Sequence, residues 1–157
     1  MTETPLNNSW RQAHLGHWLA QALQRFDARV LALMAANERV PLALANLAAR
    51  GHLTAAHVHI TRHLALQGSR LTELALRAGV SKQAMGKLVD QCEAWGLVTR
   101  SPDAQDARAR RVEFTPVGLN WLQAFQEAVL QTEDELRAAV GIEVATVITL
   151  GLEVYAA

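Results

Sequence analysis

The sequence has very little of several features that mark whole classes of protein. Its 157 residues include a single cysteine, Cys92, so an intramolecular disulfide is excluded and a reducing, cytoplasmic location is expected. We find no apolar run approaching the roughly 18 residues that a membrane span needs, and no charged-then-apolar segment typical of a signal peptide. No phosphate-binding glycine loop, Ser/His/Asp grouping or paired-carboxylate motif stands in a supporting context, so we expect neither an enzyme nor a bound cofactor.

Net charge is also absent, but the charges are unevenly distributed along the chain. Residues 70–111 carry eight basic and five acidic side chains, whereas residues 112–157 carry one basic and seven acidic ones. Only the middle of the chain is therefore suited to face a polyanion.

Composition and hydrophobic spacing predict a mostly α fold with one small β-hairpin, in a single domain over 1–157. Helices are expected over 9–36, 41–50, 55–67, 70–78, 81–95, 116–140 and 143–155. Two strands, 97–100 and 111–115, are expected to flank a polar loop, and residues 1–8 are expected to fray. Within the domain we distinguish an N-terminal arm (9–66), a winged helix-turn-helix (70–115) and C-terminal helices (116–157).

Residues 70–95 fit two short helices joined by a tight turn. Ala75 supplies the small side chain needed where the helices cross, Gly79 tolerates the positive φ of the turn, and Met85 points inward from the second helix. With Met85 and Cys92 inward, the first turns of the second helix present another set of residues outward. These are Ser81, Lys82, Gln83, Gly86 and Lys87.

This outward face is either a DNA-reading surface or an ordinary solvated helix face. Ser81 is a suitable N-cap, which puts Lys82 and Gln83 at the helix N-terminus, where contacts to base edges are usual. Glutamine can pair with adenine, lysine can reach guanine or phosphate, and Gly86 permits close approach to the groove.

The charged loop after this helix favours the DNA interpretation. Long basic side chains on a narrow β-ribbon can enter the minor groove, as we predict for Arg108 and Arg110. We interpret Asp106 as an anchor that orients the Arg108 guanidinium. An internal ion pair that pins the loop is the alternative, and both can hold at once.

The order and spacing of these residues resemble the multiple antibiotic resistance regulator (MarR) family over about residues 53–125. The resemblance is carried by Leu71-Thr-Glu-Leu-Ala, Gly79-Val-Ser-Lys-Gln-Ala, Asp106-Ala-Arg108 and Phe114-Thr-Pro-Val-Gly118. It implies a homodimer that is joined through its N- and C-terminal helices and binds a palindromic operator, with Arg108 in the minor groove supported by Asp106. The chain departs from the family at Ala107, where members often have arginine, and in its long N-terminal arm.

A homodimer has independent support, because the first and last helices contain more apolar residues than a small winged core can bury. They include Trp10, Trp18, Leu19, Trp121, Leu122, Phe125, Val144, Val147, Ile148, Leu150, Leu152 and Val154.

The histidines permit three interpretations. His59 and His63 lie one helical turn apart and could share zinc, but no cysteine or acidic residue lies nearby, so no metal site is predicted. The family resemblance implies instead a pocket for a small aromatic or anionic effector between the arm and the DNA-binding lobe. Our candidates for it are His14, His17, His57, His59 and His63, with ordinary surface or buried polar histidines as the alternative. Cys92 is interpreted as a core residue rather than a redox sensor.

The sequence therefore predicts a DNA-binding transcriptional regulator, a repressor released from its operator by a small molecule. Its expected partners are double-stranded DNA and a second copy of the chain, with no membrane. Two alternatives remain: a winged-helix interaction module without DNA readout, and a zinc-responsive regulator.

Overall fold

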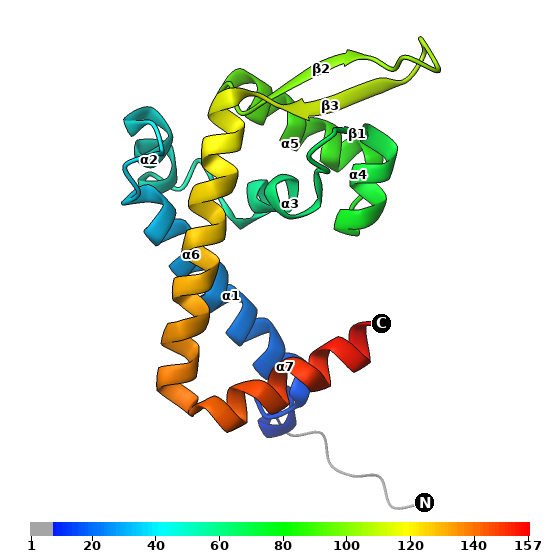
Figure 1. Cartoon of the computed structure of the whole chain (residues 1–157). Coiled ribbons are helices and arrows are strands. Elements are labelled where there is room, and N and C mark those ends of the chain that lie inside the picture. The colour runs from blue at the N-terminus through cyan, green and yellow to red at the C-terminus, as the bar shows by residue number, and fades with distance from the viewer. Residues whose placement is uncertain (1–7) are drawn as a thin grey trace, which may run out of the picture.

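Two long helices, α1 (Leu15–Ala35) and α6 (Pro116–Val140), pack against each other and connect the two ends of the molecule (Figure 1). The computed structural model describes residues 8–157, apart from the side chain of His59. The expected fraying of the N-terminus therefore lies outside the described residues for positions 1–7. None of the described helices is long and apolar enough to cross a membrane.

One end of the molecule holds the short helices and the sheet, and the other holds the last helix (Figure 1). The short helices are α2 (Leu42–Ala49), α3 (Ala55–His63), α4 (Leu71–Ala78) and α5 (Lys82–Ala94). The opposite end consists of the 3-10 turn η1 (Ser9–Gln12), the start of α1, and α7 (Ile142–Ala156). The architecture is mostly helical with a small β wing, as the sequence predicts.

The sheet has three antiparallel strands in the order β1-β3-β2. Strands β2 (Val98–Pro102) and β3 (Arg110–Phe114) form the expected hairpin, with Val98 opposite Phe114. The third strand, β1 (Ser69–Arg70), was not predicted; Ser69 pairs with Val112 and Arg70 with Arg111. A strand of two residues carries no periodicity, so only its pairing with β3 defines it.

Two predicted helix boundaries were wrong, both for local reasons. Helix α3 ends at His63 rather than at residue 67, because the chain must turn at Gly68 (φ 86°) to bring Ser69 into the sheet. The first helix is interrupted before Leu15. His14 is extended there and its Nδ1 accepts a hydrogen bond from the His17 amide at 3.2 Å, which caps α1.

The core lies where α1 and α6 meet the short helices and the sheet. It includes Val30, Met34, Leu53, Leu74, Met85, Val89, Val98, Val112 and Trp121. The Trp121 indole N–H donates to Thr61 Oγ1 at 2.7 Å, so α6 is tied to α3 inside the monomer. Trp121 is buried in this core and the half-buried Phe125 packs against it, so these two do not add to the exposed apolar surface for which a partner was predicted.

Candidate nucleic-acid interface

Helices α4 and α5 form the helix-turn-helix that the sequence predicts. Ala75 is 3% exposed and Met85 is fully buried, and Gly79 has the positive φ (67°) that the turn requires. Ser81 caps α5, its hydroxyl accepting the Ala84 amide at 3.1 Å. The other predicted face residues, Lys82, Gln83 and Lys87, are exposed, and Gly86 is half-buried.

The wing is held against the helix-turn-helix by an ion pair that the sequence did not reveal. Arg70, which precedes α4, donates from Nε and Nη2 to the two carboxylate oxygens of Asp103, each at 3.0 Å. Asp103 Oδ1 also accepts the amides of Gln105 at 2.9 Å and Asp106 at 3.2 Å. The pKa of Asp103 lies below its usual range. The hydrogen bonds from the Arg70 guanidinium are the largest cause, and the bonds from the two amides add to it.

Asp106 supports Arg108 in a different way from the one predicted. Its Oδ1 accepts the backbone amide of Arg108 at 3.0 Å, which folds the loop into an Asx turn. In the described part of the chain it forms no ion pair with the Arg108 guanidinium, so the interpretation of Asp106 as a clamp on that group was wrong. The Asx turn instead fixes the backbone of the wing at Arg108.

Three further basic residues are committed to contacts within the protein. Arg100 bridges the wing to α5, the second helix of the helix-turn-helix (the recognition helix), donating to Asp90 Oδ1 at 2.6 Å and to the Gly86 carbonyl at 3.2 Å. Arg77 donates to Ser69 Oγ at 3.3 Å, and the Arg111 guanidinium donates to Glu113 and to the Gln67 carbonyl. These contacts tie the three arginines to other parts of the lobe.

The remaining basic side chains between residues 70 and 111 have no hydrogen-bond or ion-pair partner within the described residues. They are Lys82, Lys87, Arg108 and Arg110. All four are exposed, two on the outward face of α5 and two on the wing, and all four were singled out from the sequence. Of the eight basic side chains, four are thus hydrogen-bonded within the protein, and four are displayed on one lobe without such a partner among the described residues.

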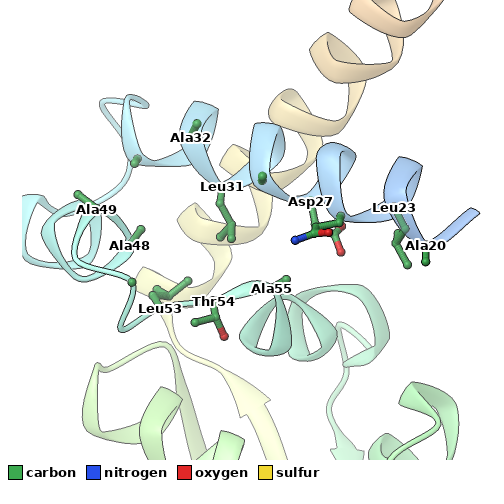
Figure 2. A pocket seen from close by; sticks show the side chains of 14 residues that line it. Ala20, Leu23, Asp27, Leu31, Ala32, Ala48, Ala49, Leu53, Thr54 and Ala55 are labelled. Atoms are coloured by element: carbon green, nitrogen blue, oxygen red, sulfur yellow. The ribbon is translucent and has the colours of Figure 1, made fainter. Parts of the chain in front are cut away.

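A second feature of the molecule is an open, largely apolar cleft of about 840 Å³ between α1 and the segment from α2 to α3. Figure 2 shows Leu31 of α1 and Leu53 on facing walls, with Asp27 at one side of the space. Much of the remaining wall is made by alanines. Such a volume lies in the range of small-molecule sites.

Of the predicted histidines, His14, His17, His57 and His63 do not line this cleft. His14 and His17 lie at the start of α1, and their rings contact each other and the neighbouring Trp18. Both ring nitrogens of His57 are used inside the lobe: Nδ1 accepts the Thr54 amide at 3.0 Å, and Nε2 lies 2.7 Å from Gln91 Oε1. The side chain of His59 lies outside the description, so the pairing of His59 with His63 remains untested. No group of three His, Cys, Asp or Glu suited to a metal occurs among the described residues.

The apolar surface far from the wing lies on α7 and around the start of α1. Helix α7 packs against α6, and of its residues only Ala145 is buried. Its exposed apolar residues are Ile142, Val144, Val147, Ile148, Leu150, Leu152, Val154 and Tyr155, and Trp10, Leu15 and Trp18 are exposed near the other terminus.

A helix-turn-helix followed by a hairpin wing, with a third short strand closing the sheet, defines a winged-helix protein. Residues 53–109 match the model of the MarR family, so this segment of the chain, which includes the helix-turn-helix and most of the wing, is similar to that family. The family is one of transcriptional regulators rather than enzymes. A comparison with curated proteins found no significant match.

Solved structures share the fold over almost the whole chain. The transcriptional repressor CouR, bound to a 23-mer DNA duplex, is 22% identical with a TM-score of 0.70, covering 98% of this chain and 100% of that one. The PcaV transcriptional regulator from Streptomyces coelicolor, in complex with its natural ligand, is 15% identical with a TM-score of 0.64, covering 98% and 96%. Wild-type MarR from E. coli in its apo form is 23% identical with a TM-score of 0.64, covering 90% and 96%. At these identities the similarity concerns the fold.

Proposed function

We propose that this protein is a transcriptional repressor that binds double-stranded DNA as a homodimer and is released by a small molecule. The observation that carries the proposal is the set of four exposed basic side chains without internal partners, Lys82, Lys87, Arg108 and Arg110. A cation with no partner in the protein can replace the counterions of a phosphate backbone. The duplex bound to CouR, which has the same fold, supports this choice of partner.

The two pairs of basic residues have different roles in this proposal. The N-terminal turns of α5 enter the major groove, where Gln83 and Lys82 reach base edges and Lys87 a phosphate. The wing follows the adjacent minor groove, with Arg108 inserted and Arg110 beside it. Ser81 and Gly86 let the backbone of α5 approach the DNA closely, and Asp106 acts through the wing turn.

A homodimer gives two such lobes, and a palindromic operator would match its twofold symmetry. The apolar faces of α7 and of the N-terminal segment support a second copy as the partner there, because this much exposed apolar surface on one end is unusual for a monomer. The cleft beside α1 offers a site for the releasing ligand, and PcaV, with the same fold, is known in complex with a ligand.

The test is a fluorescence-polarisation titration with a duplex taken from directly upstream of the gene and with a random duplex, each at several salt concentrations. Arg108→Ala should weaken binding by roughly 1–3 kcal/mol, or about 5- to 150-fold. Arg137→Ala is the matched control, since it removes an arginine on α6 that pairs with Glu133 and Asp134. Unchanged affinity of Arg108→Ala would refute the wing assignment. No binding to either duplex at any salt would refute DNA binding and favour an interaction module.

A further inference from the structure

The cleft between α1 and the α2–α3 segment has a marked charge preference. Among the described residues that line it, Asp27 is the only charged one, and Gln24 and Thr54 are the only others with polar side chains. No cationic side chain is found among the described residues that line the space, and Arg62 pairs with Asp27 from α3. A carboxylate ligand would therefore meet the oxygen of Asp27 that Arg62 leaves free. The wall therefore disfavours the anionic effector that the family resemblance implied.

Asp27 has one carboxylate oxygen still able to accept a hydrogen bond. The residue is 8% exposed, and Arg62 of α3 donates to its Oδ1. No described residue donates to Oδ2. A buried carboxylate oxygen without a donor is costly unless water or a ligand supplies one. Figure 2 places Asp27 on α1 beside Leu23 and opposite Ala55, at the rim of the apolar space.

We propose that the cleft binds an amphipathic cation, with a ring-sized apolar body between Leu31 and Leu53 and an ammonium group that donates to Asp27 Oδ2. This inference rests on the proposed function, because it names the chemical class of the releasing ligand. The alanines at Ala28, Ala32 and Ala48 leave room for a flat body, and the volume of about 840 Å³ exceeds that of a two-ring compound.

Asp27 also connects the cleft with the DNA-binding lobe. Its partner Arg62 lies on α3, and α3 packs on both helices of the helix-turn-helix. On the same helix, His57 is hydrogen-bonded to Gln91 of α5, and its ring lies 4.8 Å from that of Trp95. An ammonium group bonded to Oδ2 would compete with Arg62 for the negative charge of Asp27 and weaken the ion pair between them. Ligand binding at α1 would thereby change the position of α3 relative to α1, and with it the support that α3 gives to α5.

The probes are three compounds with the same rings and different charge: 2-naphthylmethylamine, 2-naphthylmethanol and 2-naphthoate. Their dissociation constants are measured by calorimetry on the full chain near neutral pH. We expect the amine to bind at least tenfold more tightly than the naphthoate and about fivefold more tightly than the alcohol. In Asp27→Asn the advantage of the amine should vanish, while the affinity for the alcohol changes less than threefold.

Two further variants keep this test decisive. Glu38→Gln removes an exposed carboxylate outside the cleft and should leave the preference for the amine unchanged. Ala28→Leu fills the cleft from the exposed side of α1 and should weaken all three probes together, which tests the site even if Asp27→Asn does not fold.

The proposal is overturned if the naphthoate binds as well as the amine, if Asp27→Asn keeps the preference, or if no probe binds. The coupling is tested separately, because the amine should weaken duplex binding by the wild type and not by Asp27→Asn. An amine that binds without changing duplex affinity would overturn the coupling. Failure of the unliganded protein to bind DNA would instead refute the proposed function and leave the cleft result standing.

Discussion

Arg70 and Asp103, 33 residues apart in sequence, form a two-pronged ion pair that joins the start of α4 to the end of β2. Arg100 makes a second connection, from β2 to Asp90 and to the Gly86 carbonyl on α5. The wing is therefore held to α4 by the first pair and to α5 by the second. Bidentate arginine–carboxylate geometry of this kind fixes direction as well as distance.

Removing the charge of Asp103 should loosen the wing. In Asp103→Asn the two-pronged pair with Arg70 loses its ionic character, so we expect faster hydrogen exchange at the amides of residues 103–109 and weaker DNA binding. Hydrogen-exchange mass spectrometry and the polarisation titration measure these effects. Glu143→Gln, which neutralises an exposed carboxylate on α7, is the control and should change neither. Unaltered exchange in Asp103→Asn would show that the ion pair does not order the wing.

The order of the wing should also depend on pH in a defined direction. Arg70 and the backbone amides lower the pKa of Asp103 in the folded protein. The stabilisation that the charged Asp103 gives to the wing is therefore complete above a pH of about 3.9, the ordinary pKa of aspartate. It should be lost only as the pH falls through the lower value of the folded state. Carboxyl carbon NMR shifts would follow this titration. A midpoint at the ordinary value would contradict the ion pair.

Gly118 should tolerate no larger residue, because a Cβ there would lie 1.9 Å from the Leu97 carbonyl oxygen. The start of α6 packs closely on the residues that follow α5, and the Thr115 amide donates to the same Leu97 carbonyl at 3.1 Å. Gly118→Ala should therefore destabilise the fold by about 3 kcal/mol, the upper part of the range for overpacking. Urea unfolding measures this. Gly151→Ala on α7, where a Cβ meets nothing within 4 Å, is the matched control and should cost nothing.

Cys92 should be inert in the native protein. Burial raises its pKa to about 12, so almost no thiolate exists near pH 8. An aromatic disulfide reagent should leave the folded chain unmodified and react fully once denaturant is added. Ala107→Cys, in the exposed wing loop, provides a thiol that should react at once under native conditions. Fast native reaction of Cys92 would instead favour a redox role.

A charge on α7 should disrupt the proposed dimer. Val147 is 70% exposed on the apolar face of α7, and Val147→Glu would place a carboxylate in a surface that we propose a second copy covers. Sedimentation velocity should then show monomers at concentrations where the wild type is dimeric. Leu76→Glu changes a residue that is 82% exposed on α4 and should leave the dimer intact. A dimeric Val147→Glu would argue that another surface joins the copies.

The helix-turn-helix could be predicted from sequence because its requirements are local. Ala75, Gly79 and Met85 satisfy steric requirements of the turn and the helix crossing that lie within a few residues of one another. Ser81 marks the start of α5, because serine is a common N-cap residue. The two ends of α6 were found in the same way, from Pro116 and Gly141. Strand β1 could not be found, since Ser69 and Arg70 form a strand only when β3 arrives beside them.

The amino-acid sequence by itself determined which helices form, where the turn of the helix-turn-helix lies, and which residues carry positive charge. Only the tertiary structure decided which of those charges remain free. Nothing in the local sequence separates Arg70, Arg77, Arg100 and Arg111 from Lys82, Lys87, Arg108 and Arg110, but the first four find hydrogen-bond acceptors 8 to 44 residues away in the chain. The cleft was likewise decided by packing, because its walls come from separate helices. Asp27, the one charged residue among the described residues of its lining, is paired with Arg62 of another helix. Local sterics and helix capping act within a few residues, whereas the pairing of charges depends on which segments the fold brings together.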